Sequence, residues 1–103
     1  MLYICTTGTS IAHGIRRDGS NESYRKIIRS QLDTPPPGRN FLQWASAETN
    51  SLDRMGIKDA DEIALLHTET EDGKICAEEL AVLIEKHFAI IPRLCPIEGL
   101  QVF

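Results

Sequence analysis

The sequence lacks the motifs that most often identify a nucleotide-binding or catalytic chain. It has no G-x-x-x-x-G-K-[ST] phosphate loop, no G-x-G-x-x-G turn, no G-x-S-x-G nucleophile elbow and no H-E-x-x-H pair. Its cysteines, Cys5, Cys76 and Cys95, include no C-x-x-C spacing, which argues against a zinc site or a disulfide framework. We therefore expect free thiols, no metal and no cofactor.

Long apolar runs and an excess of positive charge are also missing. No apolar run approaches the ~20 residues that cross a bilayer, and no charged leader precedes an apolar stretch as in a secretory signal. We expect a cytoplasmic protein without membrane contact. With 11 Lys and Arg against 15 Asp and Glu, the net charge of −4 disfavours sequence-independent binding to long DNA or RNA. A length of 103 residues predicts one domain with a modest core.

The first stretch of interest joins an apolar run to a group of hydroxyls. Residues 2–5 are apolar without alternation, which is typical of a strand in a parallel sheet. Ligands of such sheets bind at the carboxyl ends of the strands. There Gly8 permits a tight turn, and the hydroxyls of Thr7, Thr9 and Ser10 beside backbone N–H groups suit a phosphate. The same turn can equally be a strand exit with local hydrogen bonds.

The rest of the chain alternates helical and strand patterns. Apolar residues at helical spacing predict helices over residues 22–31, 40–55 and 74–88. Apolar runs predict a second strand over residues 62–67 and a third over 93–97, in which a proline favours an edge position.

Capping residues mark where these helices begin and end. Ser20 or Asn21 would cap the first helix, Gly56 would end the second, and Thr70 or Asp72 would cap the third. We expect a turn or loop over residues 11–21 and another over 59–61.

This order predicts an α/β fold: a Rossmann-like three-layer sandwich with a mostly parallel sheet and right-handed crossovers. About three strands fall within residues 1–103. The stretch 98–103 still carries apolar residues at Leu100, Val102 and Phe103, so we expect the chain to be the N-terminal part of a domain.

Several polar residues have two possible roles. Glu48 falls on the apolar stripe of its helix, so its carboxylate has either a dedicated partner, in a network with Ser46 and Asn50, or a ligand. His67 ends a strand, where ligands bind, whereas His13 and His87 have no ligand spacing and His87 suits packing. The acidic residues 69, 71 and 72 suit either a magnesium ion or a solvated helix cap.

Four segments in order resemble a known family. They are residues 7–10 (T-G-T-S), 45–52 (A-S-A-E-T-N-S-L), 65–77 (L-L-H-T-E-T-E-D-G-K-I-C-A) and 97–101 (I-E-G-L-Q). Together they resemble the CRISPR-associated proteins with a CARF (CRISPR-associated Rossmann fold) domain, in the branch that includes ring nucleases. The resemblance covers nearly the whole chain.

The resemblance implies a homodimeric sensor domain of type III CRISPR antiviral defence. Such a domain binds cyclic tetra- or hexa-adenylate across its two-fold axis. The ligand-binding residues that it implies are Thr7, Gly8, Thr9, Ser10, Glu48, Asn50, His67, Thr68, Asp72 and Gly73.

Two alternatives stay open beside the sensor. In the first, the chain is a metal-independent ring nuclease in which Ser10 helps a ribose 2′-hydroxyl to attack the neighbouring phosphate. The family's lysine from a later glycine-rich motif has no counterpart in these residues. In the second, the chain is an inactive half-domain that associates through its sheet edge.

Overall fold

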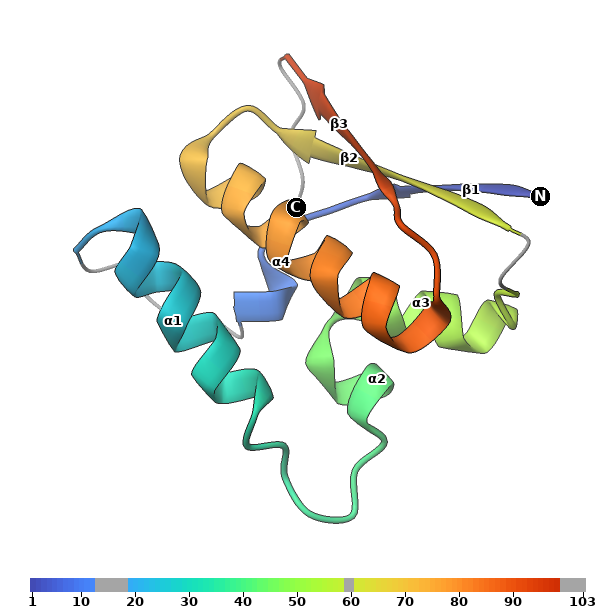
Figure 1. Ribbon diagram of the computed structural model, residues 1–103, viewed down its shortest axis with the longest axis horizontal. Helices are drawn as coiled ribbons and strands as arrows, with labels where there is room; N and C mark the ends of the chain where they lie inside the picture. The colour runs from blue at the N-terminus through green and yellow to red at the C-terminus, as the bar shows by residue number, and fades with distance from the viewer. Residues whose placement is uncertain (13–18, 59–60, 99–103) are drawn as a thin grey trace.

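Three parallel strands organise the protein. The computed structural model describes residues 1–12, 19–58 and 61–98. Strands β1 (Leu2–Thr6), β2 (Glu62–Thr68) and β3 (Arg93–Ile97) pair in the order β1-β2-β3 (Figure 1). Both pairings are parallel, with β2 in the centre. The α/β class and the parallel three-stranded sheet that we predicted are confirmed.

Helices supply the connections between the strands. The first connection contains a 3-10 turn, η1 (Ser10–Ala12), and the helices α1 (Asn21–Leu32), α2 (Phe41–Ala45) and α3 (Ala47–Met55). The second contains α4 (Glu71–Phe88) alone. Some parts of the prediction lie outside the described residues. These are His13, most of the loop expected over 11–21, part of the turn at 59–61 and the last residues of the fourth family segment.

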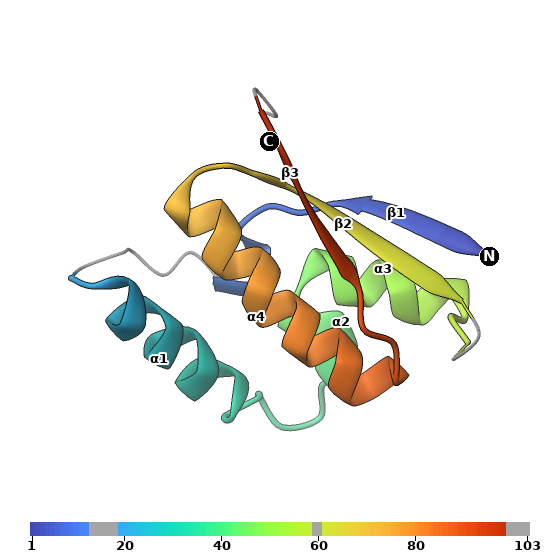
Figure 2. The same cartoon turned by 45° about the horizontal axis from the view of Figure 1, so that its top comes forward.

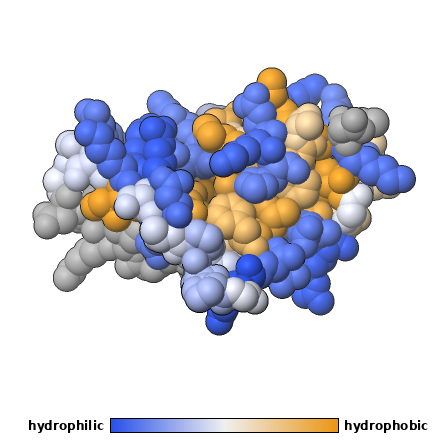
Figure 3. Space-filling view, turned by 60° about the horizontal axis from the view of Figure 1, so that its bottom comes forward, coloured by the Kyte–Doolittle hydropathy of each residue, from blue (hydrophilic) through white to orange (hydrophobic). Residues whose placement is uncertain are grey.

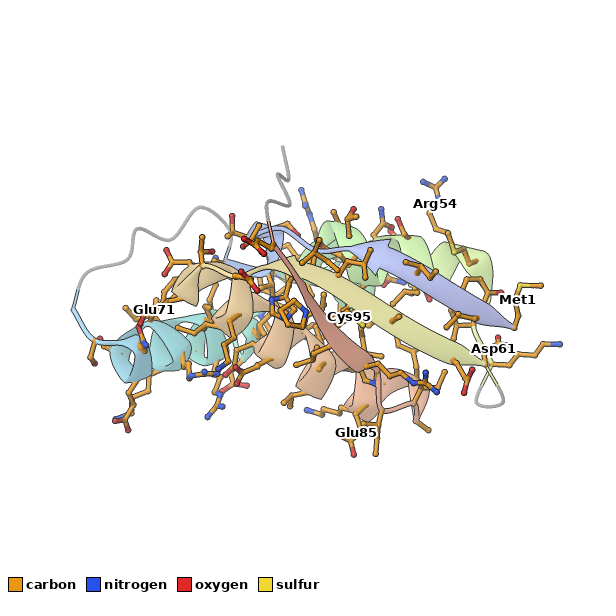
Figure 4. The ribbon with its side chains drawn as sticks, turned by 90° about the horizontal axis from the view of Figure 1, so that it is seen from above. Met1, Arg54, Asp61, Glu71, Glu85 and Cys95 are labelled. Atoms are coloured by element: carbon orange, nitrogen blue, oxygen red, sulfur yellow. The ribbon has the colours of Figure 1, made fainter. Side chains whose placement is uncertain are left out.

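The described helices cover one face of the sheet. Along β2, Ile63, Leu65 and His67 are buried while their neighbours are more exposed, because successive residues of a strand point to opposite faces. Seen obliquely and from above, the strands lie over the helices, and no described helix lies on the other side (Figures 2 and 4). The described residues therefore form two layers, without the second helical layer of a three-layer sandwich. As a result Leu2 and Ile4 are 50% and 63% exposed on the open face.

The second helix of the prediction is in fact two helices. We expected one helix over residues 40–55, but Ser46 has extended backbone angles (φ −163°, ψ 162°) and separates α2 from α3. Its Oγ accepts a hydrogen bond from the backbone N of Thr49 at 3.0 Å, so Ser46 caps α3. A serine that can bond the backbone locally competes with the continuous helix, and here that competition ends α2.

The other helix ends follow the predicted capping residues. Ser20 Oγ accepts from the Ser23 N–H at 3.1 Å and begins α1, while Gly56 ends α3 in the left-handed conformation, at φ 70°. Thr70, one of our two candidates, caps α4 through the Gly73 N–H at 3.1 Å. Because Thr70 caps it, α4 begins at Glu71 rather than at residue 74.

One core joins the helices to the sheet. Ile28, Leu52, Leu65 and Ile84, from α1, α3, β2 and α4, are completely buried. Apolar side chains are also visible on the helical side of the molecule (Figure 3). A hollow between α1, α2 and α4 is lined in part by Leu32, Phe41, Val82 and Leu83.

A buried carboxylate fixes α1 against α4. Glu79 is 4% exposed and accepts two hydrogen bonds from Arg29, at 2.9 Å each, and a longer one from Arg25 at 3.4 Å. The hydrogen bonds and the charge of Glu79 raise the pKa of the Arg29 guanidinium. A buried carboxylate needs such paired donors, because an isolated charge would be costly to bury.

Candidate functional site at the carboxyl edge of the sheet

The exits of β1 and β2 share one small cavity. Because β1 and β2 are parallel neighbours, both strand exits lie at the same edge of the sheet. The cavity has a volume of about 220 Å³, and the described residues that line it are all threonines and glycines: Thr7, Gly8, Thr9, Thr68, Thr70 and Gly73. We call it the strand-exit cavity. It brings together two segments of the chain that we had singled out separately. Of the described residues that line it, Thr70 alone lies outside our predicted set.

Gly73 allows the first turn of α4 to lie against the end of β2. A Cβ atom at this position would stand 1.9 Å from Thr68 Oγ1 and 2.9 Å from Thr70 Oγ1. Distances below 3.0 Å are not tolerated by real Cβ atoms. The absence of a side chain at Gly73 thus sets the shape of the strand-exit cavity.

Hydroxyl groups give the strand-exit cavity its polarity. Thr68 Oγ1 and Thr70 Oγ1 are hydrogen-bonded to each other at 2.8 Å, and Thr7 Oγ1 donates to the carbonyl of Leu66 at 3.2 Å. In the described part of the chain, no charged side chain lines this cavity. Each hydroxyl has a single proton, and that of Thr7 is used on the Leu66 carbonyl. The Thr68–Thr70 pair uses one of its two protons internally, so that pair and Thr9 keep donors for phosphate or ribose oxygens.

Glu48 connects α3 to the turn after β1. Its carboxylate accepts hydrogen bonds from the Gly8 N–H at 3.1 Å and from Ser10 Oγ at 2.6 Å. Ser10 Oγ in turn accepts from the Ala47 N–H at 3.2 Å. The dedicated partner that we weighed for Glu48 therefore exists, although it is this turn rather than the expected network with Ser46 and Asn50.

This arrangement changes what the T-G-T-S turn offers to a ligand. The Gly8 N–H and the Ser10 hydroxyl, which we assigned to a phosphate, already bind the carboxylate of Glu48. An anion at these two donors competes with that carboxylate, whereas Thr7 and Thr9 line the strand-exit cavity directly. Burial and, to a smaller extent, the charge of Glu48 also raise the pKa of the Cys5 thiol on β1.

Two predicted residues beyond Ser10, Glu48 and His67 are also not among those that line the strand-exit cavity. Asn50 lines a different cavity, of about 600 Å³, together with Arg39, Trp44 and Arg54. Figure 4 shows the Arg54 side chain extending away from the sheet. Asp72 is in the first turn of α4, but it is not among the residues that line the strand-exit cavity.

His67 opens onto a neighbouring cavity. It is 4% exposed, and its Nδ1 lies 2.8 Å from the carbonyl oxygen of Thr68. The cavity has a volume of about 490 Å³ and is lined by His67, Glu69, Lys74, Glu78, Leu94 and Pro96. We call it the His67 cavity. Sequence reasoning found His67 from its place at a strand end, but it did not identify Lys74 or the residues of β3.

The three thiols are free, as expected. Cys76 is buried on α4 with its Sγ 3.6 Å from the hydroxyl of Tyr24, and burial raises the pKa of the Cys76 thiol.

Among the described residues, no three His, Cys, Asp or Glu side chains are grouped so that they could hold a metal ion. In the same part of the chain, none of the helices has both the length and the apolar character to span a membrane.

Comparison with known proteins does not assign a function, so the assignment starts from the geometry of these cavities. No protein-family model matches the sequence, and a search of curated proteins gives no significant match.

Proposed function

We propose that the chain is a cytoplasmic nucleotide-binding module that senses a cyclic oligoadenylate, of tetra- or hexa-adenylate size, in type III CRISPR antiviral defence. The observation that carries the proposal is the strand-exit cavity. Its threonine and glycine lining lies at the sheet edge where parallel α/β folds bind ligands. The four-segment resemblance supplies the identity of the ligand.

The strand-exit cavity suits one phosphate and its ribose. Thr68 and Thr70 supply hydroxyls from the β2 exit, and Thr7 and Thr9 supply them from the β1 exit. Lys74 follows Gly73 in the first turns of α4 and forms no ion pair among the described residues. Lys74 lines the neighbouring His67 cavity rather than the strand-exit cavity itself, so it places a cation next to the neutral hydroxyls. This agrees with a small anionic ligand, whereas the net charge of −4 disfavours long nucleic acid.

The proposal includes a homodimer, because a cyclic ligand with two-fold symmetry needs two equivalent sites. The open face of the sheet is the surface that we assign to the contact. Leu2, Ile4 and Ile97 are exposed on it, and its charged residues Glu62 and Arg93 pair with each other at its amino end, at 3.4 Å. An apolar centre with balanced charges at the rim is typical of a protein interface. A two-fold axis parallel to the strands would place the strand exits of both protomers at the same end of the dimer.

A substitution in the strand-exit cavity tests the proposal. Thr68→Val keeps the shape of the side chain but removes its hydroxyl. We expect calorimetry to show saturable binding of cyclic tetra- or hexa-adenylate by the natural protein and about tenfold weaker binding by this variant. Thr34→Val, at the end of α1, is the matched control and should bind normally. Equal affinity of both variants would remove the strand-exit cavity from the proposal.

The ring nuclease is the second candidate function, and one observation favours it. The Ser10 hydroxyl donates to Glu48 at only 2.6 Å, so its oxygen is polarised by a carboxylate. In this alternative the 2′-oxygen of the ligand loses its proton and bonds to the adjacent phosphorus. The bond from that phosphorus to the 5′-oxygen of the next nucleotide breaks, and the 5′-oxygen takes up a proton, which leaves a 2′,3′-cyclic phosphate and a 5′-hydroxyl. Ser10 positions the phosphate. Product analysis by chromatography tests it: ring opening that persists in Ser10→Ala would exclude this role.

The inactive half-domain is tested by the same binding measurement. If the chain is only a structural fragment, neither cyclic ring will bind at any concentration, while sedimentation will still show association through the sheet. Binding of either ring excludes this alternative.

A further inference from the structure

His67 has a ring nitrogen that no described residue satisfies. The carbonyl of Thr68 can only accept a hydrogen bond, so Nδ1 of His67 carries the proton of this 2.8 Å contact. In the neutral imidazole this leaves Nε2 as an acceptor. Nε2 has no partner among the described residues, although the side chain is 4% exposed. Buried polar atoms are normally hydrogen-bonded, so an unpaired acceptor on a residue that lines a cavity indicates a place for a ligand donor.

The His67 cavity combines apolar walls with a few polar groups. Leu94 and Pro96 of β3 form its apolar side, and Lys74 and Glu78, one turn apart on α4, form its polar side. Its volume of about 490 Å³ is within the usual range for small-molecule sites. A flat heteroaromatic ring with donors and acceptors on its edge fits this lining better than a phosphate does, because Glu69 and Glu78 also line the cavity.

The His67 cavity and the strand-exit cavity share a wall. His67 lines one and Thr68, the next residue, lines the other. Similarly, Lys74 lines one and Gly73, the residue before it, lines the other. One ligand can therefore place a polar part among the threonines and a ring beside His67, across the end of β2 and the first turn of α4.

We propose that the His67 cavity is the subsite for an adenine base, in which Nε2 of His67 accepts a hydrogen bond from the exocyclic amino group. Lys74 can donate to a ring nitrogen of the same base. This inference rests on the proposed function, since it assigns one part of the same ligand. Hypoxanthine carries an oxygen in place of the amino group, so its lone pairs face those of Nε2 and the base is rejected.

The test compares adenylate rings with inosinate rings by calorimetry. The natural protein should bind cyclic tetra- or hexa-adenylate at least about tenfold more tightly than the ring of the same size built from inosine. His67→Phe keeps a planar ring without the acceptor and should bind both rings equally. His87→Phe, a histidine that packs on Phe41 outside this cavity, is the matched control and should keep the preference.

The outcomes separate the subsite from the proposed function. Equal binding of adenylate and inosinate rings by the natural protein overturns the subsite and leaves the sensor proposal standing. Absence of binding by either ring overturns both. A second measurement does not depend on the folding of a variant: ¹⁵N spectra of the natural protein should show the Nε2 resonance of His67 shifting when the adenylate ring is added. A bound ring that leaves this resonance unchanged contradicts the subsite.

Discussion

Gly73→Ala tests whether the close approach of α4 to β2 determines the shape of the strand-exit cavity. The added Cβ would stand 1.9 Å from Thr68 Oγ1, 2.9 Å from Thr70 Oγ1 and 3.2 Å from Thr68 Cβ. Inserting one methyl group into such a space costs about 1–3 kcal/mol, because side chains and backbone must move. Alanine also stabilises the helix by up to about 1 kcal/mol relative to glycine, because its helix propensity is higher. We expect a net loss of about 1–2 kcal/mol.

Urea unfolding followed by far-UV circular dichroism and by the fluorescence of Trp44 measures this loss. A change of about 1 kcal/mol corresponds to a fall in Tm of roughly 4–8 °C for a domain near this size. We also expect weaker ligand binding, since the same displacement moves Thr68 and Thr70 in the strand-exit cavity.

A double-mutant cycle with Thr68→Ala identifies the cause. Removing Oγ1 of Thr68 relieves the shortest contact and leaves the contacts with Thr70 Oγ1 at 2.9 Å and with Thr68 Cβ at 3.2 Å, so only part of the cost of Gly73→Ala is relieved. The cost of Gly73→Ala should then fall by about 1 kcal/mol in the Thr68→Ala background. If Gly73→Ala is neutral or stabilising, or costs the same in both backgrounds, then close packing against Thr68 does not explain the glycine.

Three further predictions follow from other contacts. Glu48→Gln keeps one acceptor but loses the charge and the second hydrogen bond to the turn. Thermal unfolding should therefore show a free energy of unfolding lower by about 1–2 kcal/mol, and an unchanged Tm would contradict the role of Glu48. Ile4→Glu, on the open face, should dissociate the homodimer in sedimentation, while Val82→Glu, 59% exposed on α4, should not; the same result for both would remove the open face as the contact. The Lys58 N–H and the N-terminal ammonium lower the pKa of Asp61. Its stabilisation is complete above the unfolded pKa of about 3.9 and is lost as pH falls through the lower folded value. Asp61→Asn should therefore flatten the acid limb of the stability curve, and an unchanged limb would contradict this.

Local patterns in the sequence were sufficient to predict the order and type of most elements. The apolar runs before Gly8 and before Thr68 identify buried strands, and Ser20, Gly56 and Thr70 mark helix ends through their own backbone hydrogen bonds. The break at Ser46 was missed because a serine inside an apolar helical pattern gives no signal of whether its hydroxyl caps a new helix or faces solvent.

Contacts between distant segments could not be predicted in the same way. Glu48 binds the turn at Ser10, and Glu79 pairs with Arg29. Both contacts depend on where segments far apart in the sequence lie in the fold. The open face of the sheet was also unexpected. Residues 2–5 read as a strand that is buried on both sides, yet only one side is covered among the described residues.

The unsatisfied nitrogen of His67 shows the same limit. A histidine at a strand end is a weak sign of a site by itself. Only the structure shows that one nitrogen is used by the backbone and that this histidine lines a cavity formed with α4 and β3.

Thermal unfolding with and without cyclic tetra-adenylate and cyclic hexa-adenylate is the most direct test of the proposed sensor. A ligand that binds only the folded state stabilises it by about 2.7 kcal/mol at a concentration of 100 Kd. We predict that one of the two rings raises Tm by several degrees, as expected for this stabilisation in a domain of this size. An unchanged Tm with both rings in large excess would contradict the proposal that this chain binds a cyclic oligoadenylate.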